Sequence, residues 1–301
     1  MQDSSIWFTR VCGGRHGFVL GMLRGLLEVE VLVSEVTVVE VPQWRGSGAR
    51  TAERLREGAR LVAEMVDADR RIQVEVDDDD LVVTASRVRA AVVEAGWDGL
   101  LVTAGGDCGV ELEPVAAARQ RFGDGLVVVW FDAHGDLNTP ESSPSGAFHG
   151  MVLRALTGEG PDGLVAGQPV GAGQVVLAGV RDLDPAEVAF VEARGVRWVR
   201  AADAEALVEA VGTAAAAGGG ERTAVYVHVD FDVLDPQIFG SVGSPTPEGF
   251  RPEELLELVR AITERFEVVG LGLMEYEPAG AEDQALLTSV VKELVAVCAG
   301  R

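Results

Sequence analysis

From Leu126 to Asp136 the chain reads L-V-V-V-W-F-D-A-H-G-D. The continuous apolar run at 126–131 is typical of a strand that is buried on both faces of a sheet. Asp132, His134 and Asp136 follow at every second position. In an extended segment such positions share one face, so we expect the three side chains to converge. Two carboxylates and an imidazole at the end of a buried strand are costly without compensation, and a divalent metal ion is the simplest one.

Buried strands and helical patterns alternate along the rest of the chain. Strands are expected at 36–41, 72–76, 100–103, 126–131, 174–178, 196–199, 224–229 and 268–273. Helices are expected at 51–66, 81–95, 110–120, 147–157, 203–217, 252–266 and 282–298, with a further one starting near 184. This alternation predicts an α/β fold in which helices cover both faces of a mostly parallel sheet of about eight strands.

Length and composition favour a single large domain. The 301 residues are 48% hydrophobic and show no obvious linker, so we expect one domain over 1–301. Its N-terminal segment, 1–35, is atypical, and the sequence assigns it no function. The N-terminus lacks the pattern of a signal peptide, and charged residues interrupt the apolar stretch at 18–33, so no membrane span is expected.

The net charge of −23 argues against nucleic acid or an anionic membrane as a partner. It fits a soluble protein that acts on a cationic or neutral small molecule. Three cysteines without paired spacing suggest a reducing compartment, so we expect a cytoplasmic protein.

Polar clusters follow five of the expected strands. They are Asp107 with Cys108, Asp132 to Asp136, Asp182 with Asp184, Asp230 with Asp232, and Glu275. Because ligands bind beyond the carboxyl ends of strands in such sheets, we expect all five clusters at one edge.

The two D-x-D-type clusters together supply four carboxylates and one imidazole. A single D-x-D sequence is usually a solvated turn, but four acids held together repel unless cations neutralise them. Oxygen-rich sites suit Mn²⁺ or Mg²⁺ better than Zn²⁺. Enough carboxylate is present to bridge two ions, which would allow a bridging hydroxide to act as a nucleophile.

Three separated segments carry a family resemblance: D-A-H-G-D-L-N-T-P at 132–140, S-G-A-F-H-G at 145–150 and D-F-D-V-L-D-P at 230–236. They resemble the signatures of the ureohydrolase superfamily of arginases and agmatinases, and the arginases most closely. G-G-D-C at 105–108 and M-E-Y-E-P at 274–278 match in position and order. The resemblance implies the three-layer α/β/α arginase fold, a metal-dependent amidinohydrolase and two Mn²⁺ ions per subunit.

The resemblance also implies roles for individual residues. The metal ligands would be Cys108, Asp132, His134, Asp136, Asp230 and Asp232, of which Asp132 and Asp230 bridge the two ions. Asp136 would also hydrogen-bond the hydroxide and pass a proton to the leaving amine. Glu275 would bind the substrate guanidinium, and His149 would shuttle protons, unless it is an ordinary loop histidine.

Two further segments resemble those with which arginases hold the α-carboxylate and α-ammonium groups of their substrate. Asn138, Ser143 and Ser145 belong to the first segment, and Asp182, Asp184 and Glu187 to the second. Hydroxyls and an amide suit a carboxylate, whereas acids suit an ammonium group. The alternative for the second segment is a simple helix cap. Ser244 occupies a position near the guanidinium where the family has Thr.

These segments favour an α-amino acid substrate over agmatine, which lacks a carboxylate. The first prediction is conversion of L-arginine to L-ornithine and urea. The alternatives are hydrolysis of N-hydroxy-L-arginine to hydroxyurea and ornithine, an agmatinase-like activity, or a catalytically weak binding protein of the same fold.

Cys108 departs from the family, which normally has His at this position as a terminal ligand of one ion. The thiolate could bind metal, although it is a softer donor than Mn²⁺ prefers. It could instead stand off and leave the ion weakly bound, or be a plain core thiol in a protein that has lost activity. Cys at this position also resembles a subgroup that includes N-hydroxy-L-arginine hydrolases.

Two histidines match nothing in the family pattern. His16 is left without a role, and His228 is predicted to be a core or interface residue. The resemblance also leads us to expect a homo-oligomer, a trimer or hexamer, although no stretch of the sequence shows how it would form.

Overall fold

The computed structural model describes residues 35–300; residues 1–34, which include most of the atypical N-terminal segment and His16, lie outside the described residues. The described part contains one eight-stranded sheet in the order β2-β1-β3-β8-β7-β4-β5-β6. All neighbouring strands pair in parallel, which confirms the predicted sheet. The strands are β1 (Val36–Val41), β2 (Arg70–Gln73), β3 (Leu100–Gly105), β4 (Leu126–Phe131), β5 (Val175–Ala178), β6 (Arg197–Val199), β7 (Ala224–Asp230) and β8 (Glu267–Met274).

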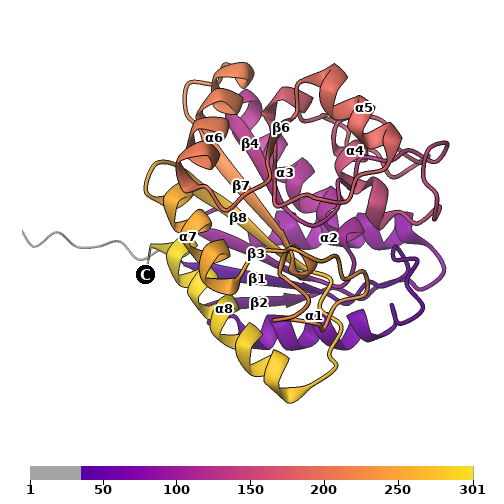
Figure 1. Cartoon of the computed structure of the whole chain (residues 1–301). Helices are drawn as coiled ribbons and strands as arrows, with labels where there is room; N and C mark the ends of the chain where they lie inside the picture. The colour runs from indigo at the N-terminus through magenta and orange to yellow at the C-terminus, as the bar shows by residue number, and fades with distance from the viewer. Residues whose placement is uncertain (1–34, 301) are drawn as a thin grey trace, which may run out of the picture. The chain divides into compact units, whose positions relative to one another are not determined.

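Helices cover both faces of this sheet, as Figure 1 shows for the labelled elements. One apolar core contains residues of α1 (Arg54–Met65), α6 (Ala204–Gly218), α7 (Pro252–Thr263) and α8 (Ala281–Ala299). The other contains residues of α2 (Leu81–Ala95), α3 (Leu112–Phe122), α4 (Val152–Leu156) and α5 (Pro185–Arg194). The three-layer α/β/α architecture is therefore confirmed.

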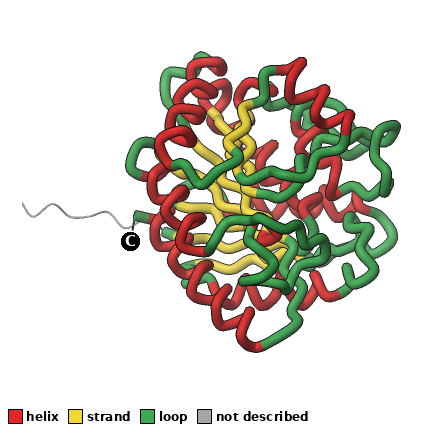
Figure 2. Tube along the Cα trace, in the orientation of Figure 1, coloured by secondary structure: helices red, strands yellow, loops and turns green. Residues whose placement is uncertain are grey.

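Sequence pattern explains the position of each strand in the sheet. All six residues of β4 are buried, as its unbroken apolar run predicts for a central strand. The edge strand β2 alternates between half-buried and exposed residues. Loops gather beyond one end of the strands in Figure 2, where the polar clusters of the sequence lie.

Side-chain size is matched across the centre of the sheet. One row of paired residues runs from Thr103 on β3 through Gly272 on β8 and His228 on β7 to Trp130 on β4. The two large rings are neighbours, and Gly272 leaves space beside them. A Cβ atom at Gly272 would lie 2.4 Å from Oε2 of Glu111, so the glycine makes room for a buried carboxylate.

Several predicted element bounds differ from the structure, and two of the differences have an identifiable physical reason. Strand β2 pairs with β1 over Arg70–Gln73 rather than 72–76, because its register with Thr37–Glu40 fixes its start. The helix expected at 147–157 shrinks to α4, since Gly146 has a φ of 67° and residues 149–151 form a 3₁₀ turn. The segment before α4 thus remains a loop.

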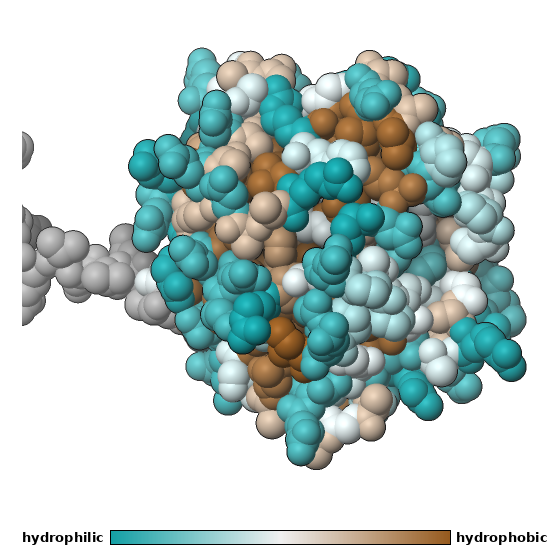
Figure 3. All heavy atoms as spheres, in the orientation of Figure 1, coloured by the Kyte–Doolittle hydropathy of each residue, from teal (hydrophilic) through white to brown (hydrophobic). Residues whose placement is uncertain are grey.

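The described surface carries few large apolar side chains. Of the large hydrophobic residues in 35–300, Val82 and Val93 are exposed. The face drawn in Figure 3 mixes extensive hydrophilic surface with smaller apolar patches. None of the helices in this range combines the length and apolar character that crossing a membrane requires.

Packing of α1 against the loop after β8 provides a stability test. A Cβ atom at Gly58 would lie 1.7 Å from the carbonyl oxygen of Tyr276, whereas one at Gly212 on α6 would meet only Phe266 at 4.0 Å. We expect Gly58→Ala to lower the free energy of unfolding by about 1–3 kcal/mol through overpacking. Gly212→Ala should raise it by about 0.5–1 kcal/mol through helix propensity.

Denaturant unfolding of the two variants checks this expectation. Equal and small effects of both substitutions would contradict the close approach of α1 to the backbone of Tyr276.

Candidate metal centre and substrate pocket

The structure brings all five polar clusters to the carboxyl edge of the sheet. Asp107 and Cys108 follow β3, Asp132 follows β4, and Asp230 ends β7. The segment with Asp182 and Asp184 follows β5, and Glu275 follows β8. Loops from five strands therefore converge on one place, as parallel topology predicts.

The geometry of residues 132–136 differs from our expectation. The segment is a turn rather than an extended continuation of β4, and Asp136 has a left-handed φ of 51°. Asp132 and His134 still converge, because the backbone N–H of His134 donates to Oδ1 of Asp132 at 2.6 Å. A turn around the Asp132 carboxylate, rather than the pleat of a strand, places these side chains together.

Asp132, His134 and Asp232 form one group of candidate metal ligands whose ligand atoms all lie within 4.8 Å of one another. Nδ1 of His134 lies 3.0 Å from Oδ2 of Asp232 and 3.4 Å from Oδ1 of Asp132. The carboxylates are fixed by backbone donors as well. Asp232 N donates to Oδ1 of Asp230 at 2.7 Å, and Ala133 N donates to Oδ1 of Asp232 at 3.1 Å.

Cys108 belongs to two further groups, one with Asp132 and His228 and one with Asp230 and Glu275. Its thiol lies 3.3 Å from Oδ2 of Asp230, to which it donates. Burial and the neighbouring Asp230 carboxylate raise the pKa of this thiol well above its usual range. A cation at this position would be needed to hold Cys108 as a thiolate.

The electrostatics of the cluster favour bound cations. Burial, and then the charge of nearby Asp232, raises the pKa of Asp132 to about 6 and that of Asp230 well above its usual range. Burial and Asp132 raise the pKa of Asp136 in the same way. Oδ2 of Asp136 is buried and has no hydrogen-bond partner among the described residues. An unpartnered oxygen within a group of mutually repelling acids fits the donor set of a divalent ion.

Histidine 134 partly offsets this repulsion. Burial disfavours its charged form, but the carboxylates of Asp232 and Asp132 outweigh burial and raise its pKa. Burial alone would raise the pKa of Asp232, but the charge of His134 outweighs burial and lowers it. One imidazolium cannot compensate Asp132, Asp136 and Asp230 as well, and the pKa values of these three carboxyls stay raised.

Backbone strain is concentrated at the same place. Asp136 and Glu275 have φ values of 51° and 64°, in the left-handed region that non-glycine residues rarely adopt. The N–H of Glu275 donates to the carbonyl of Gly106 at 2.8 Å, which holds its backbone beside β3. Strain of this kind persists where the surroundings over-determine a conformation, and it is common at functional sites.

Glu275 links Cys108 to His149. Its Oε1 accepts from Cys108 N at 3.0 Å and lies 3.0 Å from Nδ1 of His149. Burial disfavours a charged His149, but the Glu275 carboxylate outweighs burial and raises the pKa of the imidazole to about 9. His149 is therefore paired with an acid and is protonated at neutral pH in the metal-free site.

A cavity of about 270 Å³ opens above the acids. Its lining contains every candidate site residue except Cys108 and Asp132, which are buried beneath it. These lining residues are His134, Asp136, Asn138, Ser143, Ser145, His149, Asp182, Asp184, Glu187, Asp230, Asp232, Ser244 and Glu275. A cavity of this size suits a small molecule.

The rim residues are held by hydrogen bonds of their own. Asn138 Nδ2 donates to Oδ2 of Asp184 at 2.8 Å, which ties the two expected substrate-binding segments together. The Glu187 carboxylate accepts from Leu137 N and Asp184 N, both at 2.8 Å, and forms a capping box at the start of α5. Glu187 is thus a positioning residue for both segments, while Asp184 also caps the helix.

Sequence reasoning missed three contributors to this site. Arg181 donates to the carbonyl oxygens of Asp232 and Thr246 at 2.8 and 2.7 Å and so ties the loop after β7 to the loop after β5. The Thr246 hydroxyl lies 3.5 Å from Nε2 of His134. Arg181 directly precedes Asp182 in one of the two expected substrate-binding segments, whereas nothing in the sequence distinguishes Thr246 from an ordinary loop residue.

The third missed contributor is His228. It is fully buried, which confirms its assignment to the core, but it also belongs to the Cys108 group. A signal was available, because Tyr226, His228 and Asp230 alternate along β7 and so share one face.

An acid-rich, strained edge of a parallel α/β/α sheet, with a small polar cavity above it, defines a candidate dinuclear metal site. Residues 45–298 match the Arginase family. An N(omega)-hydroxy-L-arginine amidinohydrolase from Streptomyces lavendulae is 32% identical over 282 residues, which are 89% of this chain and 96% of the relative. The chain belongs to the arginase family, and it is a metal-dependent amidinohydrolase of that family.

Other relatives agree with this placement. An arginase from Staphylococcus aureus strain MRSA252 is 33% identical over 179 residues, 58% of this chain and 59% of the relative. The crystal structure of Entamoeba histolytica arginase with L-ornithine matches with a TM-score of 0.76 and 21% identity, covering 89% of this chain and 99% of that one. At that identity the structural likeness supports the fold alone.

The acid cluster predicts that divalent ions stabilise the protein. Metal-free protein should gain about 2.7 kcal/mol when an ion is added at 100 times its dissociation constant. For a domain of this size the melting temperature would rise by roughly 5–10 °C. Differential scanning calorimetry with chelator and then with Mn²⁺, Co²⁺ or Zn²⁺ measures the shift.

Asp230→Asn is the control for this experiment. Removing one charge should leave the metal-free protein at least as stable as the wild type, while the ion-induced shift is largely lost. A wild-type melting temperature that does not respond to any of the ions would contradict a metal site.

Proposed function

We propose that this protein hydrolyses the guanidino group of an α-amino acid, with two divalent metal ions bound at the carboxyl edge of the sheet. The observation that carries the proposal is the lining of the cavity. Among its lining residues, we call Asp136, Asp230, Asp232 and Glu275 the floor, and Asn138, Ser143 and Ser145 the rim. A cationic guanidinium fits the floor, and a carboxylate fits the amide and hydroxyl donors of the rim.

Six residues would hold the ions: Cys108, Asp132, His134, Asp136, Asp230 and Asp232. Asp132 and Asp230 would take part in holding both ions, as the resemblance implies; each belongs to a group of ligand atoms around Cys108, and each contacts Asp232 or its backbone. The oxygen-rich set favours Mn²⁺. The chemistry that such ions supply is activation of a water molecule as a nucleophile at neutral pH.

The protein's own groups would orient the substrate and move protons. The Glu275 carboxylate, already beside protonated His149, would accept hydrogen bonds from the guanidinium. The Asp136 carboxylate, whose Oδ2 has no hydrogen-bond partner among the described residues, would hold an ion with one oxygen and accept the proton of the attacking water with the other. That proton would then pass to the leaving amine, with His149 at the cavity lining as the exchange point with solvent.

The far end of the substrate would meet the rim. Ser143 is half-buried and Ser145 is exposed, and their hydroxyls lie 3.4 Å apart, so both can turn toward a carboxylate. Asp182 and Asp184 would attract the α-ammonium group. Ser244 lies on the same lining and would be near the guanidinium, as the resemblance implies.

L-arginine is the first candidate substrate and N-hydroxy-L-arginine the second. The second is supported by the Streptomyces lavendulae relative, whose resemblance spans 89% of this chain and 96% of its own length. Cys108 supports it as well, since the sequence resembles the subgroup with Cys at this position. The expected homo-oligomer and cytoplasmic location stay predictions.

A substrate comparison tests the proposal. Metal-loaded protein should release ornithine with urea from L-arginine or with hydroxyurea from N-hydroxy-L-arginine, and it should be much less active on agmatine. Ser143→Ala with Ser145→Ala should raise KM for the amino acid, because hydroxyl donors to its carboxylate are lost, and leave KM for agmatine unchanged. No product from any of the three compounds would refute the activity.

Replacement of Cys108 separates an active enzyme from a catalytically weak binding protein. If the thiolate is a ligand, Cys108→Ala should lose about one ion per subunit, because a terminal donor disappears, and Cys108→His should retain both. Elemental analysis after dialysis gives the count. A wild-type protein that holds one ion or none, and that Cys108→His does not restore, would favour the binding protein.

A further inference from the structure

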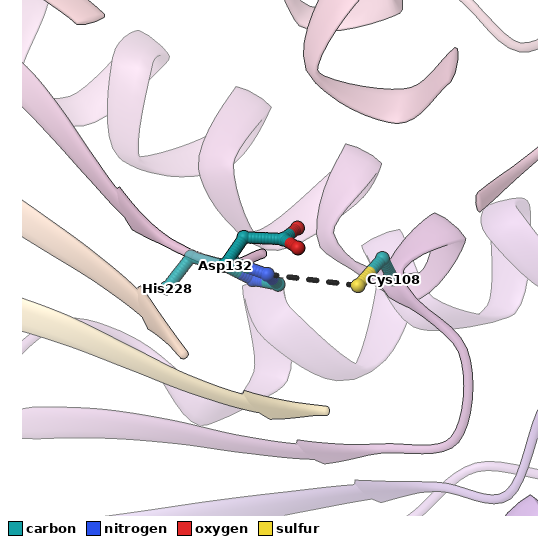
Figure 4. A group of neighbouring side chains, drawn as sticks. All are labelled: Cys108, Asp132 and His228. Atoms are coloured by element: carbon teal, nitrogen blue, oxygen red, sulfur yellow. Dashed lines mark hydrogen bonds between the residues drawn. The ribbon is translucent and has the colours of Figure 1, made fainter. Parts of the chain in front are cut away.

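A chain of buried polar groups lies directly beneath Cys108. Nε2 of His228 is 3.6 Å from Sγ of Cys108, and Nδ1 of the same ring is 3.6 Å from Oε2 of Glu111. Glu111 in turn accepts from the hydroxyl of Tyr226 at 3.1 Å. Figure 4 shows the side chains of His228 and Asp132 pointing from neighbouring strands toward Cys108.

We propose that Nε2 of His228 is a ligand of the ion that Cys108 and Asp132 bind, so that this ion has a sulfur, a nitrogen and oxygen donors. The inference rests on the metal centre of the proposed function but not on the identity of the substrate. It assigns a role to a residue that the family signatures of this sequence do not include.

The positions of the donor atoms support this role. One ligand atom each from Cys108, Asp132 and His228 lies within 4.8 Å of the others, and all three residues are at most 1% exposed. Ligands about 2.0–2.3 Å from one ion lie roughly 3–4 Å from each other. The separation of 3.6 Å between Sγ and Nε2 is therefore compatible with a shared ion.

The far side of the imidazole is arranged as metal-binding histidines require. Nδ1 of His228 and Oε2 of Glu111 lie 3.6 Å apart, and neither atom has a hydrogen-bond partner among the described residues. A carboxylate behind the ring favours the tautomer with the proton on Nδ1, which leaves the lone pair of Nε2 free for a metal. Gly272 leaves the space that the Glu111 carboxylate occupies.

The ring is also fixed in orientation. It stacks on Trp130 with 3.4 Å between ring centroids and an interplanar angle of 12°. Nε1 of Trp130 donates to Oδ2 of Asp132 at 3.0 Å. One indole therefore positions two of the three donors, so the group is preorganised for an ion rather than merely filling the core.

With this donor set, the two metal positions differ in the chemical type of their ligands. The position of His134 keeps oxygen-rich ligands, which suit Mn²⁺, whereas thiolate and imidazole favour Zn²⁺, Co²⁺ or Fe²⁺. The two positions should therefore fill with different affinities for softer ions.

The test measures metal binding without substrate. Metal-free wild-type, His228→Asn, Glu111→Gln and Thr103→Val proteins are titrated with Co²⁺ against a competing chelator, and their absorption spectra are recorded. Loss of a supporting partner costs about 10–100-fold in metal affinity, so Glu111→Gln should fall in that range. His228→Asn should lose more than 100-fold at one position and alter the thiolate-to-cobalt charge-transfer band.

Thr103→Val is the matched control, because Thr103 is buried in the same row, contacts the Tyr226 hydroxyl at 3.5 Å and touches no ligand. Its affinity should stay within about twofold. If His228→Asn keeps wild-type affinity and spectrum, the inference is wrong while the proposed function stands. If the wild-type protein binds no divalent ion, the proposed metal centre fails with it.

X-ray absorption of wild-type protein loaded with one equivalent of Zn²⁺ decides the question even if His228→Asn does not fold. We expect a sulfur scatterer at about 2.3 Å together with imidazole nitrogen at about 2.0–2.1 Å. Sulfur without imidazole at that ion would overturn the inference.

Discussion

Mutual repulsion of buried carboxylates is the constraint on which this site depends. Parallel strands deliver Asp132, Asp136, Asp230 and Asp232 to one edge, where burial and like charge raise the pKa of three of them. Backbone N–H groups fix the oxygens of Asp132, Asp230 and Asp232 in place, so these charges cannot move apart. The fold therefore preserves an electrostatic cost that bound cations relieve, and the metal centre follows from the topology of the sheet.

Backbone strain and rigid loops are found next to the same buried acids. Asp136 and Glu275 hold left-handed backbone conformations next to the acids, and Arg181 ties two of the surrounding loops together through carbonyl oxygens. Because positions on strand ends and tied loops vary little, the donor atoms are preorganised. Stability lost locally is offset by the two apolar cores on either face of the sheet.

Much of the fold was predictable, because the spacing of apolar residues along the chain determines which segments form buried strands and which form helices. The run at 126–131 and its counterparts gave eight parallel strands, and residues that follow strands were bound to meet at one edge. The turn at 132–136 was not predictable, because hydrogen bonds to the Asp132 carboxylate determine it rather than any repeat. Contacts between distant segments, such as that of His228 with Glu111, depend on the register of the strands and could not be predicted from the sequence.

The cavity lining, like the chain as a whole, carries more acidic than basic residues. Seven of the lining residues are acids, while the two histidines of the lining are each paired with a carboxylate. Two divalent ions would neutralise the floor, while Asp182 and Asp184 of the lining would still attract a cation and Glu275 would bind one beside His149. A substrate with cationic guanidinium and ammonium groups complements that remainder, and its carboxylate then needs neutral donors, which Ser143 and Ser145 provide. The charges along the cavity therefore support the proposed guanidino amino acid as substrate.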